Sequence, residues 1–545
     1  MSQVPTAPKI NVGTPAVQKP GAPLTSYDKL PGTQRPVPTT HLDGLAVAAT
    51  LASIRVAPVS KCRVLEIGCA IGGNLLPMAQ QFPGSTFLGI DNSFKQIAAA
   101  QKTAAGAGLT NIKFEVMDLT TMGSDLGEFD YIIANGIFSW VRPAAREALL
   151  PTISRLLAPT GVAFVNYHVY PGWHGREMLR EAIALRVQGA GDTLEVIARA
   201  RDFLNWIDRY SQSPAESPFP HAHVIRAEAR FLTTTPDDYL LHEYLEAFPV
   251  AIYFRQFVAQ LAASGLNYVC EVKVNPFRKQ MIDELRGERG ANADWMQIEE
   301  DIDVVLGAFM RRSLICKNLQ APSPTPILEN IEHLSARALV LPTAMPQSIT
   351  SDEAMSFQFV DGRTVQLSEA PVKMILIALS RAWPQALPIG QMIQTMQSDL
   401  QLGANFAAPN TPERQQILAT LVACASAGVV ELHSQPVEFV PYATEKPKAT
   451  ALARYQAREG KWVTSLIHTL VINLTKTDRL LLAHLNGARD RNALVAVLKA
   501  AIAKGVLPNP AVDQGAAIEA GLQSDLEQVV EQSLTRLASE HFLQA

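Results

Sequence analysis

The sequence predicts an α/β fold: a doubly wound, Rossmann-like sheet with helical insertions, followed by smaller α+β modules of winged-helix-like shape. Two observations predict the sheet. Short apolar runs alternate with stretches of helical spacing between residues 63 and 167, and the first run ends in a turn of small residues at 68–73. This alternation is typical of parallel strands whose connecting helices cover both faces, and such sheets bind ligands at the carboxyl ends of their strands.

Each element follows from its local pattern. The predicted strands are apolar runs at 63–67, 86–90, 112–116, 131–134 and 161–167. Helical spacing of apolar residues predicts helices at 42–57, 74–81, 94–107 and 142–157. Beyond residue 167 the pattern turns helical, and strands at 266–274 and 313–317 are expected to rejoin the same sheet. We therefore expect helical insertions at about 176–240 and 277–310.

Composition divides the chain into segments. Residues 1–25 are rich in Pro, Thr, Gly and Ala and have almost no large apolar side chains, so a disordered tail is expected there. A stretch rich in Pro and Ala is expected to be a linker. The predicted segments are the tail at 1–25, a sheet domain at 26–320, the linker at 321–345, a winged-helix-like module at 346–440 and a mainly helical module at 441–545.

The bulk composition argues against several classes of partner. The 545 residues carry a net charge of −4 with a pI near 6.3, so no nucleic acid partner is expected. The 5 cysteines lack C-x-x-C pairing and His at ligand spacing, so neither a disulfide framework nor a metal site is expected. No run approaches the ~18 apolar residues of a membrane span, and the N-terminus lacks a signal-peptide pattern. We expect a cytoplasmic protein without a membrane span.

The turn after the first strand predicts a nucleotide-shaped ligand. Its glycines allow the backbone to approach a ligand at positions where a Cβ would collide with it. Asp91 ends the next strand, where a carboxylate can accept hydrogen bonds from both ribose hydroxyls. The pattern Gly68-x-Ala70-x-x-Gly73 is also a degraded dinucleotide fingerprint. Two cofactors, a dinucleotide and a methyl donor, therefore fit the turn itself.

Four features in order favour S-adenosylmethionine over a dinucleotide. Glu66 lies where a carboxylate reaches the amino acid part of that donor, and the turn has the form E-x-G-x-A-x-G. Asp118 follows the third strand, from which it can hold adenine, and the fourth strand ends at the polar Asn135. Taken alone, Asp91 also fits a helix N-cap and Asp118 a turn carboxylate. The predicted donor-binding residues are Glu66, Gly68, Ala70, Gly72, Asp91, Asn92, Asp118, Leu119 and Asn135.

The methyl acceptor is expected at the mouth of this site, because an in-line displacement requires an aligned acceptor and the exclusion of water. The turn 135–138 is similar to the Asn-Pro-Pro-aromatic tetrapeptide of amine methyltransferases, but it lacks both prolines, so a plain strand-end turn fits as well. Aromatic and His residues at 166–174 can hold an alkyl-ammonium or orient a proton, and a packed aromatic turn fits equally. The predicted catalytic residues are Asn135, Tyr167 and His168, and the predicted substrate-pocket residues are Phe138, Trp140, Tyr170 and Trp173.

Short motifs along most of the chain after residue 25 resemble bacterial methyltransferases that carry a methyltransferase regulatory domain. The most specific is Tyr-Leu-Leu-His-Glu-Tyr-Leu-Glu at 239–246. The other motifs are Tyr27-Asp28, Thr40-His41, 65–69, 136–141, 170–174, 265–268, 311–314 and 485–491. Characterised members of that family include lysine methyltransferases of outer-membrane proteins. They are homodimers with a donor-binding domain, an inserted dimerisation segment, a middle domain and a C-terminal winged-helix-like domain.

The resemblance implies S-adenosyl-L-methionine as cofactor, a protein acceptor methylated on lysine nitrogen, and a homodimer. Two departures lie beside the expected methyl group: 166–168 reads Asn-Tyr-His instead of Ser-Tyr-Asn, and Asn135-Gly136 replaces His-Gly. The acceptor therefore stays open, and the alternatives are a small-molecule methyltransferase or a donor-binding regulatory or scaffolding protein. A dinucleotide oxidoreductase would need a second, nicotinamide-binding motif, which the sequence lacks. His242-Glu243 has no second His at the zinc-protease spacing, so a structural anchor role is expected.

Overall fold

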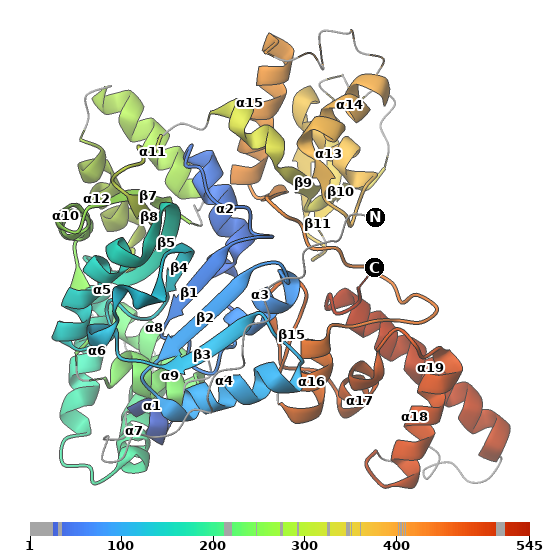
Figure 1. Ribbon diagram of the computed structural model, residues 1–545, viewed down its shortest axis with the longest axis horizontal. Helices are drawn as coiled ribbons and strands as arrows, with labels where there is room; N and C mark the ends of the chain where they lie inside the picture. Colours follow the sequence, from blue (N-terminus) through green and yellow to red (C-terminus); the bar gives the residue numbers. More distant parts are fainter. Residues whose placement is uncertain are drawn as a thin grey trace.

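In the computed structural model the main sheet has 8 strands in the order β3-β2-β1-β4-β5-β8-β7, with β6 paired to β5 (Figure 1). The strands are β1 (Arg63–Ile67), β2 (Thr86–Asp91), β3 (Ile112–Val116), β4 (Phe129–Ala134), β5 (Leu157–Val169), β6 (Ala251–Ile252), β7 (Leu266–Glu271) and β8 (Met310–Lys317). The structure describes residues 26–30, 35–211, 221–246, 248–272, 276–290, 294–323, 327–344, 349, 351, 353–359, 361–399, 401, 403, 406, 408, 410–460, 462–507 and 518–544. The predicted tail at 1–25 lies outside the described residues.

The strand order places the topological switch point of the sheet at β1. Strands β1 to β5 run parallel, whereas β8 is antiparallel to β5 and β7 is antiparallel to β8. The chain builds outward from β1 through β2 to β3, and then returns to the other side of β1 with β4 and β5. Ligands of open α/β sheets bind at such a switch point, between the loops that follow the two neighbouring strands. The predicted doubly wound sheet, including the return of two late strands, is confirmed.

Helices cover both faces of the sheet, because neighbouring residues of a strand point to opposite sides. Val64 packs with α2, α3 and α4, while Leu65 packs with α5 and α10 on the other side. These helices are α2 (Leu42–Leu51), α3 (Leu75–Gln81), α4 (Phe94–Gly106), α5 (Pro143–Leu156) and α10 (Phe254–Ala263). The predictions for α3, α4 and α5 agree within one residue at each end. Helix α2 ends earlier than predicted, just before Ser53 adopts a left-handed backbone conformation with φ of 62°.

Two helical insertions interrupt the sheet domain, as predicted. The first comprises α6 (Trp173–Arg186), α7 (Thr193–Ser211), α8 (His221–Thr234), α9 (Asp237–Tyr239) and the π-helix η4 (Leu240–Tyr244). Its apolar side chains, among them Leu204 and Leu232, form a core of their own. The second comprises α11 (Pro276–Arg289) and α12 (Trp295–Leu306). Short helical segments complete the domain: α1 (Ser26–Lys29), η1 (Pro38–Thr40), η2 (Leu119–Thr121) and η3 (Ser124–Leu126).

A middle module packs against α2, beside the sheet domain (Figure 1). It contains two three-stranded sheets, β10-β11-β12 and β13-β9-β14. Its elements are η5 (Leu328–His333), β9 (Ser335–Ala338), β10 (Val340–Pro342), β11 (Met355–Phe359), β12 (Thr364–Leu367), α13 (Ala370–Ser380), β13 (Leu387–Pro388), α14 (Ile389–Asp399), α15 (Pro412–Ser426) and β14 (Val430–His433). The predicted linker at 321–345 differs from the structure here. Ile331, Ala336 and Val340 fill the core of this module, so its described part from Leu328 onward is folded.

The C-terminal module lies on the other side of α3 and α4 from the first insertion (Figure 1). Its elements are α16 (Ala451–Glu459), β15 (Val463–Thr464), β16 (Leu470–Val471), α17 (Lys476–His484), α18 (Arg491–Ala503) and α19 (Ile518–Ser539). Helix α16 packs so closely on α4 that a Cβ on Gly106 would lie 2.1 Å from Cε2 of Tyr455. Among the described helices, none has both the length and the apolar character needed to cross a bilayer.

Candidate active site

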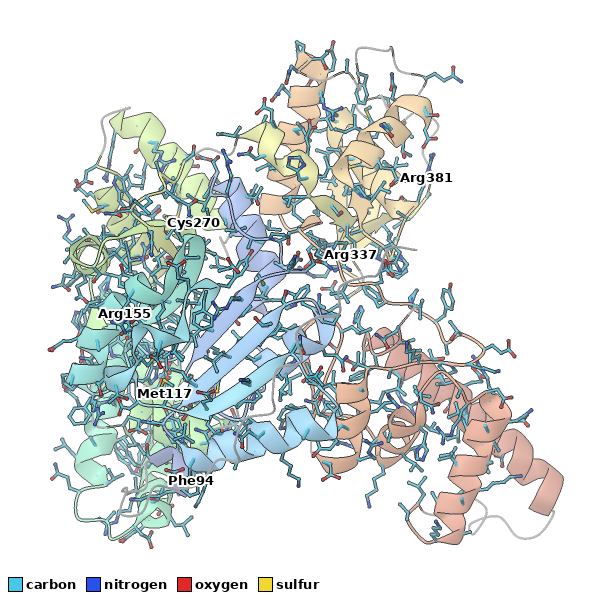
Figure 2. All side chains as sticks on the ribbon, in the orientation of Figure 1. Phe94, Met117, Arg155, Cys270, Arg337 and Arg381 are labelled. Atoms are coloured by element: carbon cyan, nitrogen blue, oxygen red, sulfur yellow. The ribbon has the colours of Figure 1, made fainter. Side chains whose placement is uncertain are left out.

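The candidate site lies at the carboxyl edge of the parallel strands, where the loops after β1 to β5 meet. Met117, just after β3, and Phe94, at the start of α4, lie at this edge in Figure 2. The turn after β1 is held closed by the neighbouring strand, since the amides of Gly68 and Cys69 both donate to the carbonyl oxygen of Ile90. The loop after β1 is therefore anchored to the end of β2.

Two glycines of this turn, Gly68 and Gly72, have no room for a side chain. Gly68 and Gly72 have φ of +75° and +73°, the left-handed region that favours glycine. A Cβ would lie 2.2 Å from Cδ1 of Ile137 at the first position and 2.5 Å from Cζ of Phe114 at the second. Ala70, with φ of 46°, is a non-glycine residue of the turn that also has a positive φ. The close-packed backbone forms the kind of cradle that a nucleotide-shaped ligand requires.

Glu66 is the buried acid of the turn. Its side chain is 0% exposed, and Oε1 accepts a hydrogen bond of 2.8 Å from Nδ2 of Asn74. Its other oxygen, Oε2, has no hydrogen-bond partner among the described residues. Burial raises the pKa of Glu66 to about 8. An unpartnered buried carboxyl oxygen is costly to a fold, so its retention at this turn indicates a position where a ligand supplies the missing partner.

Asp91 ties the loops after β1 and β2 together. Its Oδ2 accepts from the amide of Ala70 at 3.0 Å, and its Oδ1 accepts from the amide of Ser93 at 2.8 Å. Burial raises the pKa of Asp91 despite these two bonds. The N-cap of α4 is Ser93, whose Oγ accepts from the amide of Gln96, so Asp91 does not have the capping role that its position also allowed. The neighbouring Asn92 is exposed.

Asp118 lies at the same edge, after β3. It is the N-cap of η2, with Oδ1 accepting from the amide and the hydroxyl of Thr120, and Oδ2 lies 2.5 Å from Nη2 of Arg142. Burial alone would raise the pKa of Asp118, but the bonds from Thr120 and Arg142 outweigh it and lower the pKa. Leu119 is partly buried on the α5 side of the sheet. Arg142, just before α5, was not singled out in the sequence, because nothing in the local pattern connects it with Asp118.

The loop after β4 opens toward solvent at Gly136. Its φ is +72°, and a Cβ built there would meet nothing within 4 Å. The amide of Gly136 donates to Oδ1 of Asn166 at 2.6 Å, which joins the ends of β4 and β5. Asn135 is half-buried beside it. This is the open end of the site, in contrast to the closed turn after β1.

The predicted acceptor residues divide into two groups. Phe138 and Tyr167 lie in the core, where Tyr167 stacks on Phe257 of α10 with ring centroids 4.0 Å apart. His168 points to the opposite side of β5 and lies in an aromatic cluster. Its ring stacks on Trp173 at 3.4 Å and lies 4.2 Å from Trp140. The structure therefore brings His168, Trp140 and Trp173 together and separates Tyr167 and Phe138 from them.

Glu243 of the π-helix η4 holds this cluster. Its Oε1 accepts from Nε2 of His168 at 3.1 Å, and its Oε2 accepts from Nε1 of Trp140 at 2.7 Å. Burial lowers the pKa of His168, which keeps the imidazole neutral. Tyr170 lies further out, with its hydroxyl 3.0 Å from Oε2 of Glu177. The sequence had assigned Glu243 only an anchoring role, because nothing local connects it with β5, 75 residues away.

The N-terminal helix α1 completes the edge. The ring of Tyr27 stacks on His242 with centroids 3.9 Å apart, and Nε2 of His242 lies 2.8 Å from the carbonyl oxygen of Leu30. On the other side, Asp28 accepts from Oγ of Ser93, next to Asp91. Helix α1 thus bridges η4 and the loop after β2. No group of residues in the described part of the chain has the composition and proximity to hold a metal ion.

Comparisons with known proteins decide the family. Three family models match: "Methyltransferase domain" over 64–161, "Predicted methyltransferase regulatory domain" over 236–317, and "PKMT, C-terminal winged helix domain" over 445–542. Protein RP028 of Rickettsia prowazekii is 31% identical over 233 residues, which cover 43% of this chain and 92% of that protein. The chain belongs to the S-adenosylmethionine-dependent methyltransferases with a regulatory domain.

Two further matches cover nearly the whole chain. Protein RP789 of Rickettsia prowazekii is 26% identical over 492 residues, covering 88% of this chain and 87% of that protein. The structure of PKMT2 from Rickettsia typhi, also solved in complex with AdoHcy, superposes with a TM-score of 0.77 at 23% identity, covering 94% of this chain and 100% of PKMT2. The winged helix match covers the stretch for which the sequence predicted a mainly helical module, whereas the predicted winged-helix-like module at 346–440 corresponds to the middle module.

Proposed function

We propose that this methyltransferase transfers methyl groups from S-adenosylmethionine to lysine side-chain nitrogen in a protein. The observation that carries the donor half is the buried, unpartnered Oε2 of Glu66 beside a turn that excludes side chains. Two findings support a protein acceptor: the match of 445–542 to the winged helix domain named for PKMT, protein lysine methyltransferases, and the fold shared with PKMT2.

The donor would be held by acids from three neighbouring loops. We assign Glu66 to its amino acid part, Asp91 to the ribose, and Asp118 with Leu119 to adenine; the glycine turn lies beneath them. When bound, the donor supplies an electrophilic methyl group on a positively charged sulfur. The carboxyls of Glu66 and Asp91 share one buried edge, and each has a raised pKa, so a cationic ligand would favour their ionised forms. This is a chemical match between the acids and the donor.

The acceptor would enter at the open end, over Gly136. Asn135 lies there and can accept a hydrogen bond from an amine, which leaves the lone pair of the nitrogen directed at the methyl group. Trp140 offers an aromatic face for an alkyl-ammonium, and its indole is fixed by Glu243. His168 is fully buried, so we assign it to positioning Glu243 and Trp173. Tyr167, enclosed in the core, has no part in this proposal.

Incubation with radiolabelled S-adenosylmethionine and host lysate tests the acceptor. Label is expected in protein, on lysine, and should be identified by mass spectrometry of the labelled bands. Label in the small-molecule fraction alone would instead support the small-molecule alternative. Calorimetry with S-adenosylhomocysteine tests the donor half separately: absence of binding by the wild-type protein would contradict the proposed function at its first step.

We further propose a homodimer, with the first insertion as its contact. Exposed apolar side chains gather on α7 and near it: Leu194 is 77% exposed, Tyr210 60% and Trp206 47%. Sedimentation velocity should give twice the chain mass of 59.2 kDa, and Trp206→Glu together with Tyr210→Glu should give the monomer. A cytoplasmic location and the lack of a nucleic acid partner stay predictions.

A further inference from the structure

The C-terminal module reaches the donor turn through one histidine. His468 lies in the loop between β15 and β16, with φ of 58°, and its ring is 3% exposed. Its Nε2 lies 2.8 Å from Oδ1 of Asn74, a fully buried residue directly before α3. Nδ2 of Asn74 in turn donates to Oε1 of Glu66 at 2.8 Å. A continuous hydrogen-bonded path therefore runs from the C-terminal module to the acid that we assign to the donor.

A backbone amide determines which group donates and which accepts at each hydrogen bond of this path. The amide of Val37 points at Oδ1 of Asn74 at 3.0 Å, and an amide N–H can only donate. This sets which end of the Asn74 side chain is oxygen, so Nε2 of His468 must carry a proton and Nδ2 must face Glu66. Burial and the neighbouring ring of His41, 5.0 Å away, hold the pKa of His468 well below its ordinary value. His468 is thus a neutral donor with a single tautomer.

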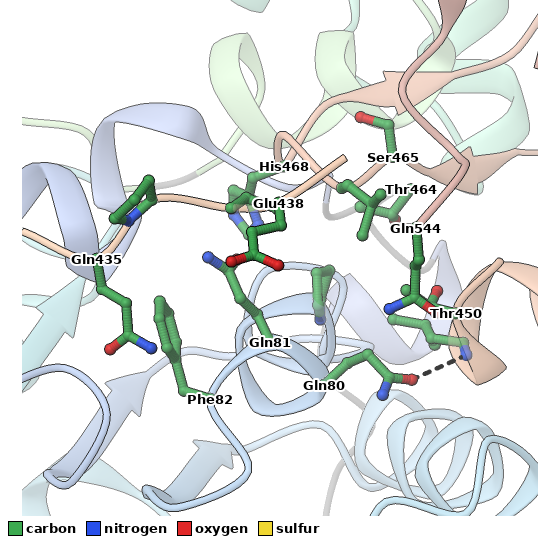
Figure 3. A pocket seen from close by; sticks show the side chains of 15 residues that line it. Gln80, Gln81, Phe82, Gln435, Glu438, Thr450, Thr464, Ser465, His468 and Gln544 are labelled. Carbon is green, nitrogen blue, oxygen red and sulfur yellow. Dashed lines mark hydrogen bonds between the residues drawn. The ribbon is translucent and has the colours of Figure 1, made fainter. Parts of the chain in front are cut away.

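Few polar contacts accompany this one at the junction. The amide of Leu452 donates to Oε1 of Gln80 at 3.1 Å, which joins α16 to α3 without touching Glu66. Beside these two contacts lies a cavity of about 230 Å³, lined by His468 and Gln80 among others (Figure 3). The junction is therefore incompletely filled, and among the junction contacts of the described residues the His468 contact reaches the side chain that bonds Glu66.

We infer that His468 is a positioning residue for donor binding: through Asn74 it holds Oε1 of Glu66 and thereby leaves Oε2 directed at the donor. The inference rests on the proposed donor role of Glu66. It gives the C-terminal module a defined task within the same chain, because Nε2 of His468 adds a hydrogen bond to the side chain of Asn74, which Val37 and Thr40 also hold. A module without this task would influence donor binding only through overall stability.

A pair of substitutions tests the hydrogen bond itself. In His468→Gln the side-chain amide can replace Nε2–H, whereas the shorter His468→Asn cannot reach Asn74. Calorimetric titration of the full-length protein with S-adenosylhomocysteine should show affinity within about twofold of wild type for H468Q and a roughly three- to tenfold loss for H468N. Asn tolerates the left-handed conformation better than Gln, so backbone strain predicts the opposite order. Equal affinities of H468N and wild type would overturn the inference.

A double-mutant cycle separates positioning from general stability. In the Glu66→Gln background, H468N should cause no further loss, because its effect passes through Glu66; additive losses would contradict the path. Gln80→Ala removes the contact between α16 and α3, which does not touch Glu66, and should leave donor affinity unchanged; a loss equal to that of H468N would mean that any loosening of the junction suffices.

A second variant covers the case in which H468N does not fold. Asn74→Ala breaks the path from within the sheet domain and should reproduce the loss of affinity, and an unchanged affinity would equally overturn the inference. Binding by the wild type distinguishes a failure of the proposed function from a failure of the role of His468. If the wild type does not bind S-adenosylhomocysteine, the proposed function fails; if it binds but H468N and N74A bind equally well, only the role of His468 fails.

Discussion

The two ends of the candidate site are built differently. At the donor end, the turn after β1 and the carboxylates of Glu66 and Asp91 come from neighbouring strands, and a Cβ on Gly72 would meet the ring of Phe114. At the acceptor end, Gly136 faces open space and His168 is held by Glu243 from an inserted π-helix. The donor end is thus built mainly from consecutive strands and their loops, whereas the acceptor end depends on residues that only the insertion brings into place. Enzymes that bind the same cofactor but different acceptors would need a donor end that stays constant and an acceptor end that can change.

The largest effect is expected from a matched pair of glycines. Gly72 and Gly136 have nearly equal φ, +73° and +72°, but only the first has a buried ring within 3 Å of its missing Cβ. Gly72→Ala should lower the free energy of unfolding by about 1–3 kcal/mol more than Gly136→Ala, the usual cost of overpacking. Chemical denaturation measures both. Equal losses would mean that the donor end is no more closely packed than the acceptor end.

Glu243→Gln should separate methyl transfer from donor binding. The substitution keeps the size of the side chain but weakens the hold on His168 and Trp140, so turnover on the protein acceptor should fall roughly 10- to 100-fold, as for a misplaced substrate contact. The dissociation constant of S-adenosylhomocysteine should stay within about twofold of wild type. The exposed Glu147→Gln on α5 is the control and should behave as wild type. If E243Q also lost donor affinity, the donor and acceptor ends would not be independent of each other.

Asp91→Ala should show the opposite pattern. Loss of charge-assisted hydrogen bonds to the donor should weaken binding by about 1.5 kcal/mol, roughly tenfold, while turnover at saturating donor is largely retained. Calorimetry and steady-state kinetics measure the two quantities. Asp125→Ala removes an exposed acid of η3 and serves as the control. Unchanged donor affinity in D91A would remove Asp91 from the site.

The last expected effect is a pH dependence of stability at Glu66. Its pKa is about 8 in the folded protein, against 4.5 for an ordinary glutamate, so its contribution to stability is fully present below about pH 4.5 and is lost as the pH rises through 8. Glu66→Gln removes this titration. The melting temperature of E66Q relative to wild type, both without donor, should therefore rise by a few degrees between pH 6 and pH 9. A constant difference would mean that Glu66 ionises normally.

Prediction from sequence was strongest for the sheet and weakest between modules. Strand β1 was predicted to the residue, because an apolar run followed by a glycine turn has few alternative structures. The linker prediction at 321–345 was made from composition, yet Ala336 and Val340 are core residues there. Small apolar residues are compatible with a linker or a packed strand. Which of the two forms depends on the strands that pair with them, such as β14.

The sequence by itself determined the parallel sheet and placed Glu66, Asp91 and Asp118 at or near the carboxyl ends of its strands, because each depends on residues close together in the chain. Only the tertiary structure decided that Tyr167 faces the core while His168 meets Glu243, and that His468 reaches Asn74 from 394 residues away. These contacts depend on how insertions and modules dock. Docking is governed by buried surfaces and hydrogen-bond partners that no local spacing encodes.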